Sequence, residues 1–102
     1  MSRGIHRLNI FDKEPENLPD MLGLAIEWVA LKDYKNAEVY LKRIIERDSN
    51  YIEAYKQYAE LPEILNNIEE AKIIYSKGIE AAKRIEDIQS IKEMEDLLNE
   101  LK

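Results

Sequence analysis

The stretch that decides the fold is Lys32-Asp33-Tyr34-Lys35-Asn36-Ala37-Glu38, which recurs 34 residues later as Asn66-Asn67-Ile68-Glu69-Glu70-Ala71-Lys72. At this lag the small residues coincide, Ala71 falling on Ala37. The bulky apolar positions coincide as well, Ile68 falling on Tyr34. Self-similarity at a period of roughly 20 to 50 residues is the sign of a repeated supersecondary unit. The sequence therefore predicts a repeat architecture.

The same lag extends the match on both sides of this stretch. It places Tyr75 on Leu41, Tyr55 on Met21, Tyr58 on Leu24 and Ala59 on Ala25. One further period toward the N-terminus sets Pro15 opposite Ser49, so residues 5–13 fall where the second helix of an earlier repeat would lie. We therefore predict an N-terminal half-repeat helix over residues 3–14.

Helical periodicity accompanies the first copy of the repeat. Between residues 18 and 31 an apolar stripe consists of Leu18, Met21, Leu22, Ala25, Ile26, Trp28 and Val29. Asn17 precedes it as an N-cap, and Pro19 stands in the first turn, where proline is tolerated. Asp33 is predicted to cap a second helix that ends near Arg47. Its inward residues are expected to be Tyr34, Ala37, Tyr40, Leu41, Ile44 and Ile45.

The second copy follows a break and a new cap, which we predict at Asp48-Ser49-Asn50. A third helix should then begin near Tyr51, with Ile52, Ala54, Tyr55, Tyr58 and Leu61 pointing inward. A fourth helix is expected over residues 68–84, with Ala71, Ile74, Tyr75, Gly78, Ile79 and Ala82 inward.

The last segment, residues 86–101, has a one-sided pattern. Its apolar stripe is Ile88, Ile91, Met94, Leu98 and Leu101, and charged or polar residues fill the other positions. A repeat array cannot leave its final apolar face in water, so a terminal helix with a polar outer side is expected. The prediction is thus one all-α domain over residues 1–102 with five to six helices: a half-repeat helix (3–14), two repeats (18–50 and 51–84) and a capping helix (86–101).

These positions resemble the tetratricopeptide repeat family, whose pattern is W-x2-L-G-x2-Y, then Ala, then x3-Phe, then Pro. The first repeat supplies Met21, Leu24, Ala25, Trp28, Ala37, Leu41 and Ser49 at these positions. The second supplies Tyr55, Tyr58, Ala59, Pro62, Ala71, Tyr75 and Lys83. The closing proline of the family is absent from both. Generic helical hairpins are the fallback interpretation.

Besides the missing closing proline, Pro62 departs from the family pattern, because it stands inside a helix at a position for a large aromatic residue. A proline within a helix removes one hydrogen bond and costs about 3 kcal/mol or more. We therefore expect a kink or an early end near Leu61, with residues 63–65 forming a further turn.

The resemblance implies a concave groove, lined by the first helix of each repeat, that binds a peptide or a partner helix. On this alignment the apolar groove positions are Leu22, Ile26 and Val29. One period later they are followed by the polar set Lys56, Gln57 and Glu60. We expect these six residues to bind a protein or peptide partner. The groove lacks the Lys and Asn clamp with which some relatives recognise the terminal carboxylates of chaperones.

Two alternatives to a foreign partner stay open for the apolar patch. Ile5, Leu8 and Phe11 of the N-terminal segment would cover it in the first. In the second, the patch closes a homodimer, and the protein is a structural building block of a larger assembly.

Composition argues against other classes of function. Acidic residues outnumber basic ones by 21 to 15, giving a formal net charge of −6, the wrong sign for a domain that binds nucleic acid. The chain has no cysteine, and no window reaches the roughly 18 apolar residues of a membrane span. We found no signal-peptide pattern, so we expect a soluble, cytoplasmic protein.

Catalysis, cofactors and metals are not expected either. His6 is the sole histidine, so a histidine-based triad or a multi-histidine metal site cannot be formed. The three glycines are isolated, which excludes a glycine-rich phosphate loop. Carboxylate pairs such as Glu60 with Glu63 are usually solvated charges on a helix surface. We therefore predict a non-catalytic protein-interaction module.

Overall fold

The computed structural model describes residues 17–101, and the predicted helix at 3–14 lies outside them, as do His6, Ile5, Leu8 and Phe11. Five helices follow one another within the described part: α2 (Leu18–Ala30), α3 (Tyr34–Arg47), α4 (Ile52–Ile64), α5 (Ile68–Arg84) and α6 (Ile88–Glu100). Residues 17–101 contain no strand. The predicted all-α fold class is therefore confirmed.

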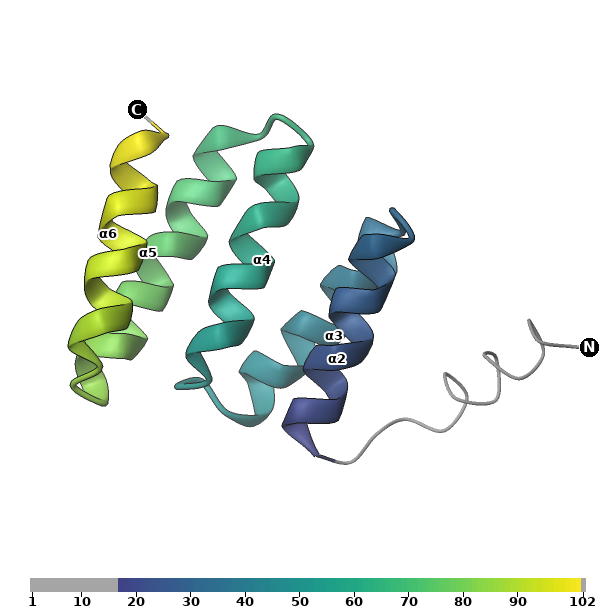
Figure 1. Ribbon diagram of the computed structural model, residues 1–102, viewed down its shortest axis with the longest axis horizontal. Coiled ribbons are helices and arrows are strands. Elements are labelled where there is room, and N and C mark those ends of the chain that lie inside the picture. The colour runs from purple at the N-terminus through teal and green to yellow at the C-terminus, as the bar shows by residue number, and fades with distance from the viewer. Residues whose placement is uncertain (1–16, 102) are drawn as a thin grey trace, which may run out of the picture.

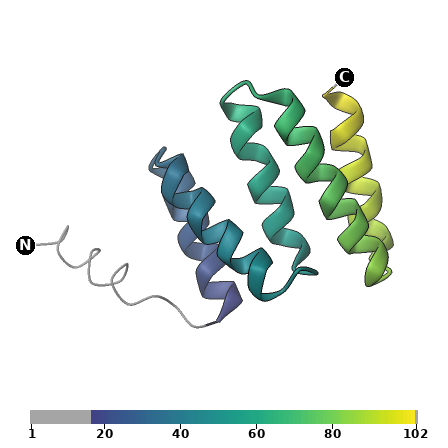
Figure 2. The ribbon, with the colours of Figure 1, turned by 180° about the vertical axis from the view of Figure 1, so that it is seen from behind.

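The helices form two antiparallel hairpins, α2–α3 and α4–α5, against which α6 packs as a fifth helix (Figure 1). Figure 1 faces the side of the molecule formed by α2, α4 and α6, which we call the front face. In Figure 2, seen from behind, α3 and α5 come forward and form the back face. Each helix packs on its successor, and α2 also contacts α4.

Side-chain caps fix where four of the helices begin. Asn17 Oδ1 accepts a hydrogen bond from Asp20 N at 2.9 Å, and Asp33 Oδ1 accepts one from Asn36 N at 3.3 Å, as the sequence predicted. Asn67 and Asp87 cap α5 and α6 in the same way. The cap predicted within residues 48–50 is wrong, because Tyr51 occupies the N-cap position of α4 without a side-chain hydrogen bond.

The turns after α2, α4 and α5 share one geometry. Each contains a residue other than glycine in the left-handed region: Lys32 (φ 63°), Asn66 (φ 66°) and Glu86 (φ 58°). In each, the next backbone N–H closes back onto the preceding helix, at Trp28 O, Pro62 O and Ala82 O respectively. This is the Schellman type of helix end, which satisfies carbonyls that would otherwise lack partners. The chain therefore reverses direction within three residues at each of these points.

Pro62 does not end α4 early, because the helix continues through it to Ile64. The proline falls in the last turn of the helix, which Leu65 N closes by donating to Leu61 O at 3.1 Å. Pro62 is also buried. The predicted end near Leu61, with a separate turn over residues 63–65, is thus wrong.

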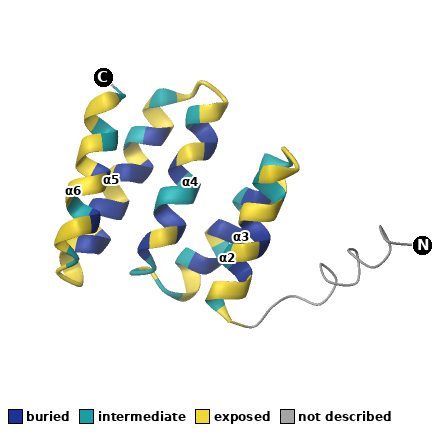
Figure 3. Cartoon of the chain, in the orientation of Figure 1, coloured by how far each residue is buried: buried dark blue, intermediate teal, exposed yellow. Residues whose placement is uncertain are grey.

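The interior consists of two apolar clusters that meet at α4 (Figure 3). Leu41 and Ile44, both fully buried, belong to the first cluster, between α2, α3 and α4. Tyr75 and Met94 belong to the second, between α4, α5 and α6. One residue departs from the predicted inward pattern of the last segment: Ile88 is 72% exposed. Ser90 instead occupies a buried position near the start of α6.

Candidate partner-binding surfaces

The predicted apolar patch lies on α2, and its three members differ in exposure. Leu22 and Val29 are half-buried and pack against the first apolar cluster. Ile26 is 44% exposed. The structure thus uses Leu22 and Val29 partly for packing and leaves Ile26 as the large apolar side chain of α2 that is exposed to solvent.

Lys56, the basic member of the predicted set, is held against α6. Its Nζ lies 2.6 Å from Glu93 Oε1 and 3.7 Å from Glu53 Oε2. Burial disfavours the charged form of Lys56, but the hydrogen bond to Glu93 and the nearby carboxylates outweigh it and raise the pKa of Lys56. The same hydrogen bond, together with one from Gln89, lowers the pKa of Glu93. The charge of Lys56 is therefore balanced inside the domain.

Farther along α4, two carboxylates carry charge that no cation balances. Glu60 is exposed, yet desolvation by the surrounding protein and the charge of Glu63 raise its pKa. The Tyr75 hydroxyl donates to Glu63 Oε1 at 3.4 Å, and its burial, followed by the charge of Glu63, raises the pKa of Tyr75 well above its usual range. Within residues 17–101 neither Glu60 nor Glu63 forms an ion pair.

The six predicted residues therefore lie on two adjoining helices but do not act as one group. Leu22 and Val29 share an apolar cluster, whereas Lys56 contacts α6. Gln57 is half-buried, and Glu60 is exposed. Glu60 occupies the place in α4 that Ile26 occupies in α2, one repeat earlier.

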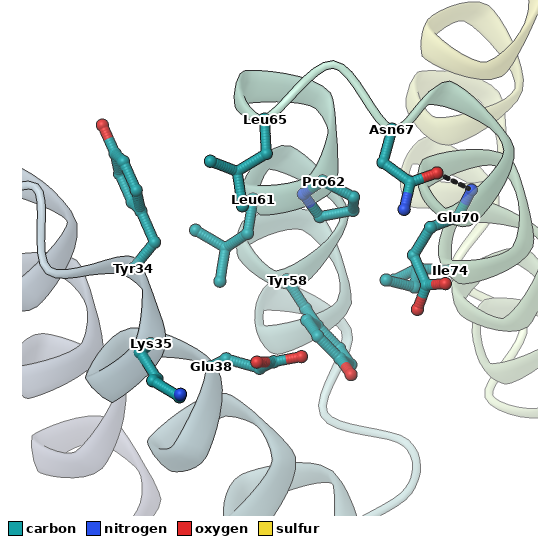
Figure 4. A pocket seen from close by; sticks show the side chains of 10 residues that line it. All are labelled: Tyr34, Lys35, Glu38, Tyr58, Leu61, Pro62, Leu65, Asn67, Glu70 and Ile74. Carbon is teal, nitrogen blue, oxygen red and sulfur yellow. Dashed lines mark hydrogen bonds between the residues drawn. The ribbon is translucent and has the colours of Figure 1, made fainter.

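A pocket that the sequence did not predict lies between α3, α4 and α5 and has a volume of about 440 Å³. Figure 4 views it with α6 behind α5, as in Figure 2, so it opens on the back face near the α4–α5 turn. We call it the back pocket. Its apolar lining consists of Tyr34, Tyr58, Leu61, Pro62, Leu65 and Ile74.

Charged side chains stand on both walls of the back pocket. Lys35 and Glu38 come from α3, and Glu70 comes from α5. Glu38 forms an ion pair with Lys42, whose Nζ lies 3.6 Å from Glu38 Oε2. Lys35 and Glu70 form no ion pair within the described part of the chain. The pocket thus has an apolar floor, a free cation on one wall and a free carboxylate on the other.

One signal in the sequence coincides with this pocket. At the repeat lag Pro62 takes the place of Trp28, so a small ring replaces a large aromatic one. Pro62 lines the back pocket, whereas Trp28 packs against the first apolar cluster. Sequence reasoning treated Pro62 as a backbone problem and overlooked the volume that a smaller side chain leaves.

The described residues hold no cluster of three or more histidine, cysteine or acidic side chains that could bind a metal ion. None of the helices in this part of the chain is long and apolar enough to cross a membrane.

Comparison with known proteins identifies the fold. No family model matches the sequence, and no curated protein matches it. The solution structure of a tetratricopeptide repeat domain protein of Salinibacter ruber gives a TM-score of 0.82 at 23% identity, covering 88% of this chain and 91% of that one. The crystal structure of a tetratricopeptide repeat domain protein of Salinibacter ruber gives 0.75 at 22% identity, covering 83% and 96%.

A protein of Bordetella parapertussis is also similar in structure, with a TM-score of 0.79 at 18% identity over 99% of this chain and 88% of that one. At these identities the likeness shows the fold. It confirms the resemblance that was inferred from the 34-residue repeat.

Proposed function

Because the chain has the tetratricopeptide repeat fold, we propose that it is a non-catalytic module that binds a polypeptide through its front face. The observation that carries the proposal is Ile26, an exposed apolar side chain flanked by two half-buried ones, Leu22 and Val29. An apolar residue of a partner can extend this patch and remove it from water.

The charges beside this patch indicate what else the partner carries. Lys56 is neutralised by Glu53 and Glu93, whereas Glu60 and Glu63 have no cation partner among residues 17–101. Desolvation and, after it, the charge of Glu63 raise the pKa of Glu60, and a basic side chain would offset both by favouring the charged carboxylate. The partner that fits is therefore a segment in which a bulky apolar residue stands close to Lys or Arg.

The test is to select peptides from a random displayed library on the immobilised full chain and to measure the affinity of the selected peptides by fluorescence polarisation. We expect enrichment of an apolar residue next to a basic one. Burying one large aliphatic side chain is worth about 1.5–3 kcal/mol, so Ile26→Glu should weaken binding by about tenfold or more. Ile73→Glu, which alters an exposed apolar residue of α5, is the matched control.

Equal binding by the wild type and Ile26→Glu would refute the proposal, as would the absence of any enriched peptide. The alternative, in which the same patch closes a homodimer, predicts a dimer that Ile26→Glu converts to a monomer. Sedimentation equilibrium of both proteins separates the two functions.

A further inference from the structure

The back pocket faces away from the proposed peptide surface and has a complement elsewhere on the same chain. That complement is the α5–α6 turn, which presents Ile85 (45% exposed) and Ile88 (72% exposed) to solvent. Lys83 precedes these residues, and Glu86 lies between them. Neither charged residue forms an ion pair within residues 17–101. We call residues 83–88 the apolar knob.

The knob is held in a fixed shape. The positive φ of Glu86 and the bond from Asp87 N to Ala82 O, 2.9 Å, close the turn tightly. Arg84 ties the base of the knob to the loop between α3 and α4, with Nε donating to Asn50 Oδ1 at 2.8 Å. Little conformational entropy remains to be lost when such a turn binds. Two apolar side chains kept in water on a rigid turn indicate a contact surface.

We infer that the back pocket binds the apolar knob of a second copy of this chain. Ile88 and Ile85 would then lie against the apolar floor at Leu61, Pro62 and Leu65. The charges fit in the same arrangement, because the knob carries one basic and one acidic residue, Lys83 and Glu86, while Glu70 and Lys35 stand on the two walls of the pocket. Lys83 would face Glu70, and Glu86 would face Lys35.

Pocket and knob lie at opposite ends of the helices. The α4–α5 turn borders the pocket at one end, and the α5–α6 turn forms the knob at the other (Figure 1). A chain therefore cannot fill its own pocket while folded. A contact between two different surfaces is heterologous and joins copies head to tail. One turn in a pocket buries less than a standard interface, so the association is weak and depends on concentration.

Sedimentation equilibrium of the full chain over a hundredfold concentration range tests this inference. The wild type should exceed the mass of one chain, 12.0 kDa, as concentration rises. Ile88→Asp removes the knob and Leu65→Asp spoils the pocket, and each should weaken association by about tenfold or more. Both residues are mostly exposed, so folding should survive, which circular dichroism checks.

The decisive sample is an equimolar mixture of the two variants. Ile88→Asp keeps an intact pocket and Leu65→Asp keeps an intact knob, so the mixture should form dimers and nothing larger. A symmetric interface would not be restored by mixing. Ile26→Asp, on the front face, is the control that should associate like the wild type.

A second pair of variants tests the charges and serves if Leu65→Asp fails to fold. Glu70→Lys and Lys83→Glu should each weaken association. Their mixture should recover it, because the lysine introduced into the pocket of one variant then faces the glutamate introduced into the knob of the other. The inference is overturned if the wild type stays monomeric throughout, or if neither mixture associates more than its separate components. It is also overturned if Ile26→Asp abolishes association.

Discussion

At the scale of single residues, Gly78 controls how closely three helices approach. A Cβ atom at this position would lie 2.7 Å from Met94 Sδ and 2.9 Å from Tyr55 Cβ. The methionine sulfur can move, but Tyr55 Cβ is fixed to the backbone of α4. Any side chain at Gly78 therefore has to separate α5 from its neighbours.

We expect Gly78→Ala to lower the free energy of unfolding by about 1–3 kcal/mol, the usual cost of overpacking a core. This is despite the gain in helix propensity of about 1 kcal/mol that replacing a mid-helix glycine brings. Gly23→Ala is the matched control, because nothing lies within 4 Å of its Cβ and the propensity gain should appear in full. Urea unfolding measures both; equal stabilisation of the two variants would contradict this account.

These two glycines show what the sequence reveals at this scale. Periodicity placed Gly78 on the inward face of its helix, which is confirmed by its burial. Gly23 stands beside Leu22, one of the predicted groove residues, and is exposed. The size of the gap opposite each glycine depends on how the neighbouring helix sits, and no pattern along one helix encodes that distance.

At the scale of elements, the attachment of α6 depends on two ionised carboxylates. Asp87 accepts hydrogen bonds from the backbone and the hydroxyl of Ser90, at 3.2 Å and 2.7 Å, and both lower its pKa. Glu93 accepts from Lys56 across the gap to α4, and its pKa is also lowered. A carboxyl group with a lowered pKa stabilises the fold above its ordinary pKa and loses this contribution as the pH falls.

We therefore predict that Asp87→Asn, which keeps the hydrogen-bond acceptor but not the charge, is less stable than the wild type at neutral pH. The difference in the free energy of unfolding should shrink as the pH falls below the ordinary pKa of aspartate, about 3.9, and then through the lowered pKa of Asp87 in the folded protein. Urea midpoints of the two proteins between pH 7 and pH 3 provide the measurement. A difference that stays constant with pH would show that the charge of Asp87 has no part in capping.

At this scale the sequence predicted the helices and the caps of α2 and α3, but it did not predict which way the start of α6 faces. Caps at Asn17 and Asp33 were found because a short polar residue precedes an apolar stripe. Ile88 was assigned to the buried stripe because it fits the period, but α6 begins at this residue, and in its first turn Ser90 is buried while Ile88 faces solvent. The sharp reversal at Glu86 determines that orientation, and a positive φ at a glutamate has no marker in the sequence.

At the scale of the whole molecule, α4 connects the two apolar clusters. It contributes Ala54 and Leu61 to the first, and Ile52, Tyr55 and Ala59 to the second. A loss of packing in either cluster should therefore destabilise the other through this helix.

Trp28 is the sole tryptophan and packs against the first cluster, so its fluorescence reports on that end of the chain. We predict that Met94→Ala, in the second cluster, lowers the urea midpoint seen by Trp28 fluorescence as much as the midpoint seen by circular dichroism at 222 nm. Truncating a buried methionine costs about 2–5 kcal/mol. Leu41→Ala, in the first cluster, should shift both signals in the same way. If Met94→Ala left the urea midpoint of Trp28 fluorescence unchanged, the two ends of the domain would unfold separately.

Because α4 belongs to both clusters, the boundary of the sequence repeat is not a boundary of the packing. The sequence divides at about residue 50, where one copy of the 34-residue pattern gives way to the next. The packing does not divide there, since α3 is covered by α4 from the following copy. A gene cut at the boundary of the pattern would yield a hairpin whose apolar surface toward α4 faces water. Duplication of this sequence unit extends an array because each copy covers the apolar surface that the preceding copy leaves open.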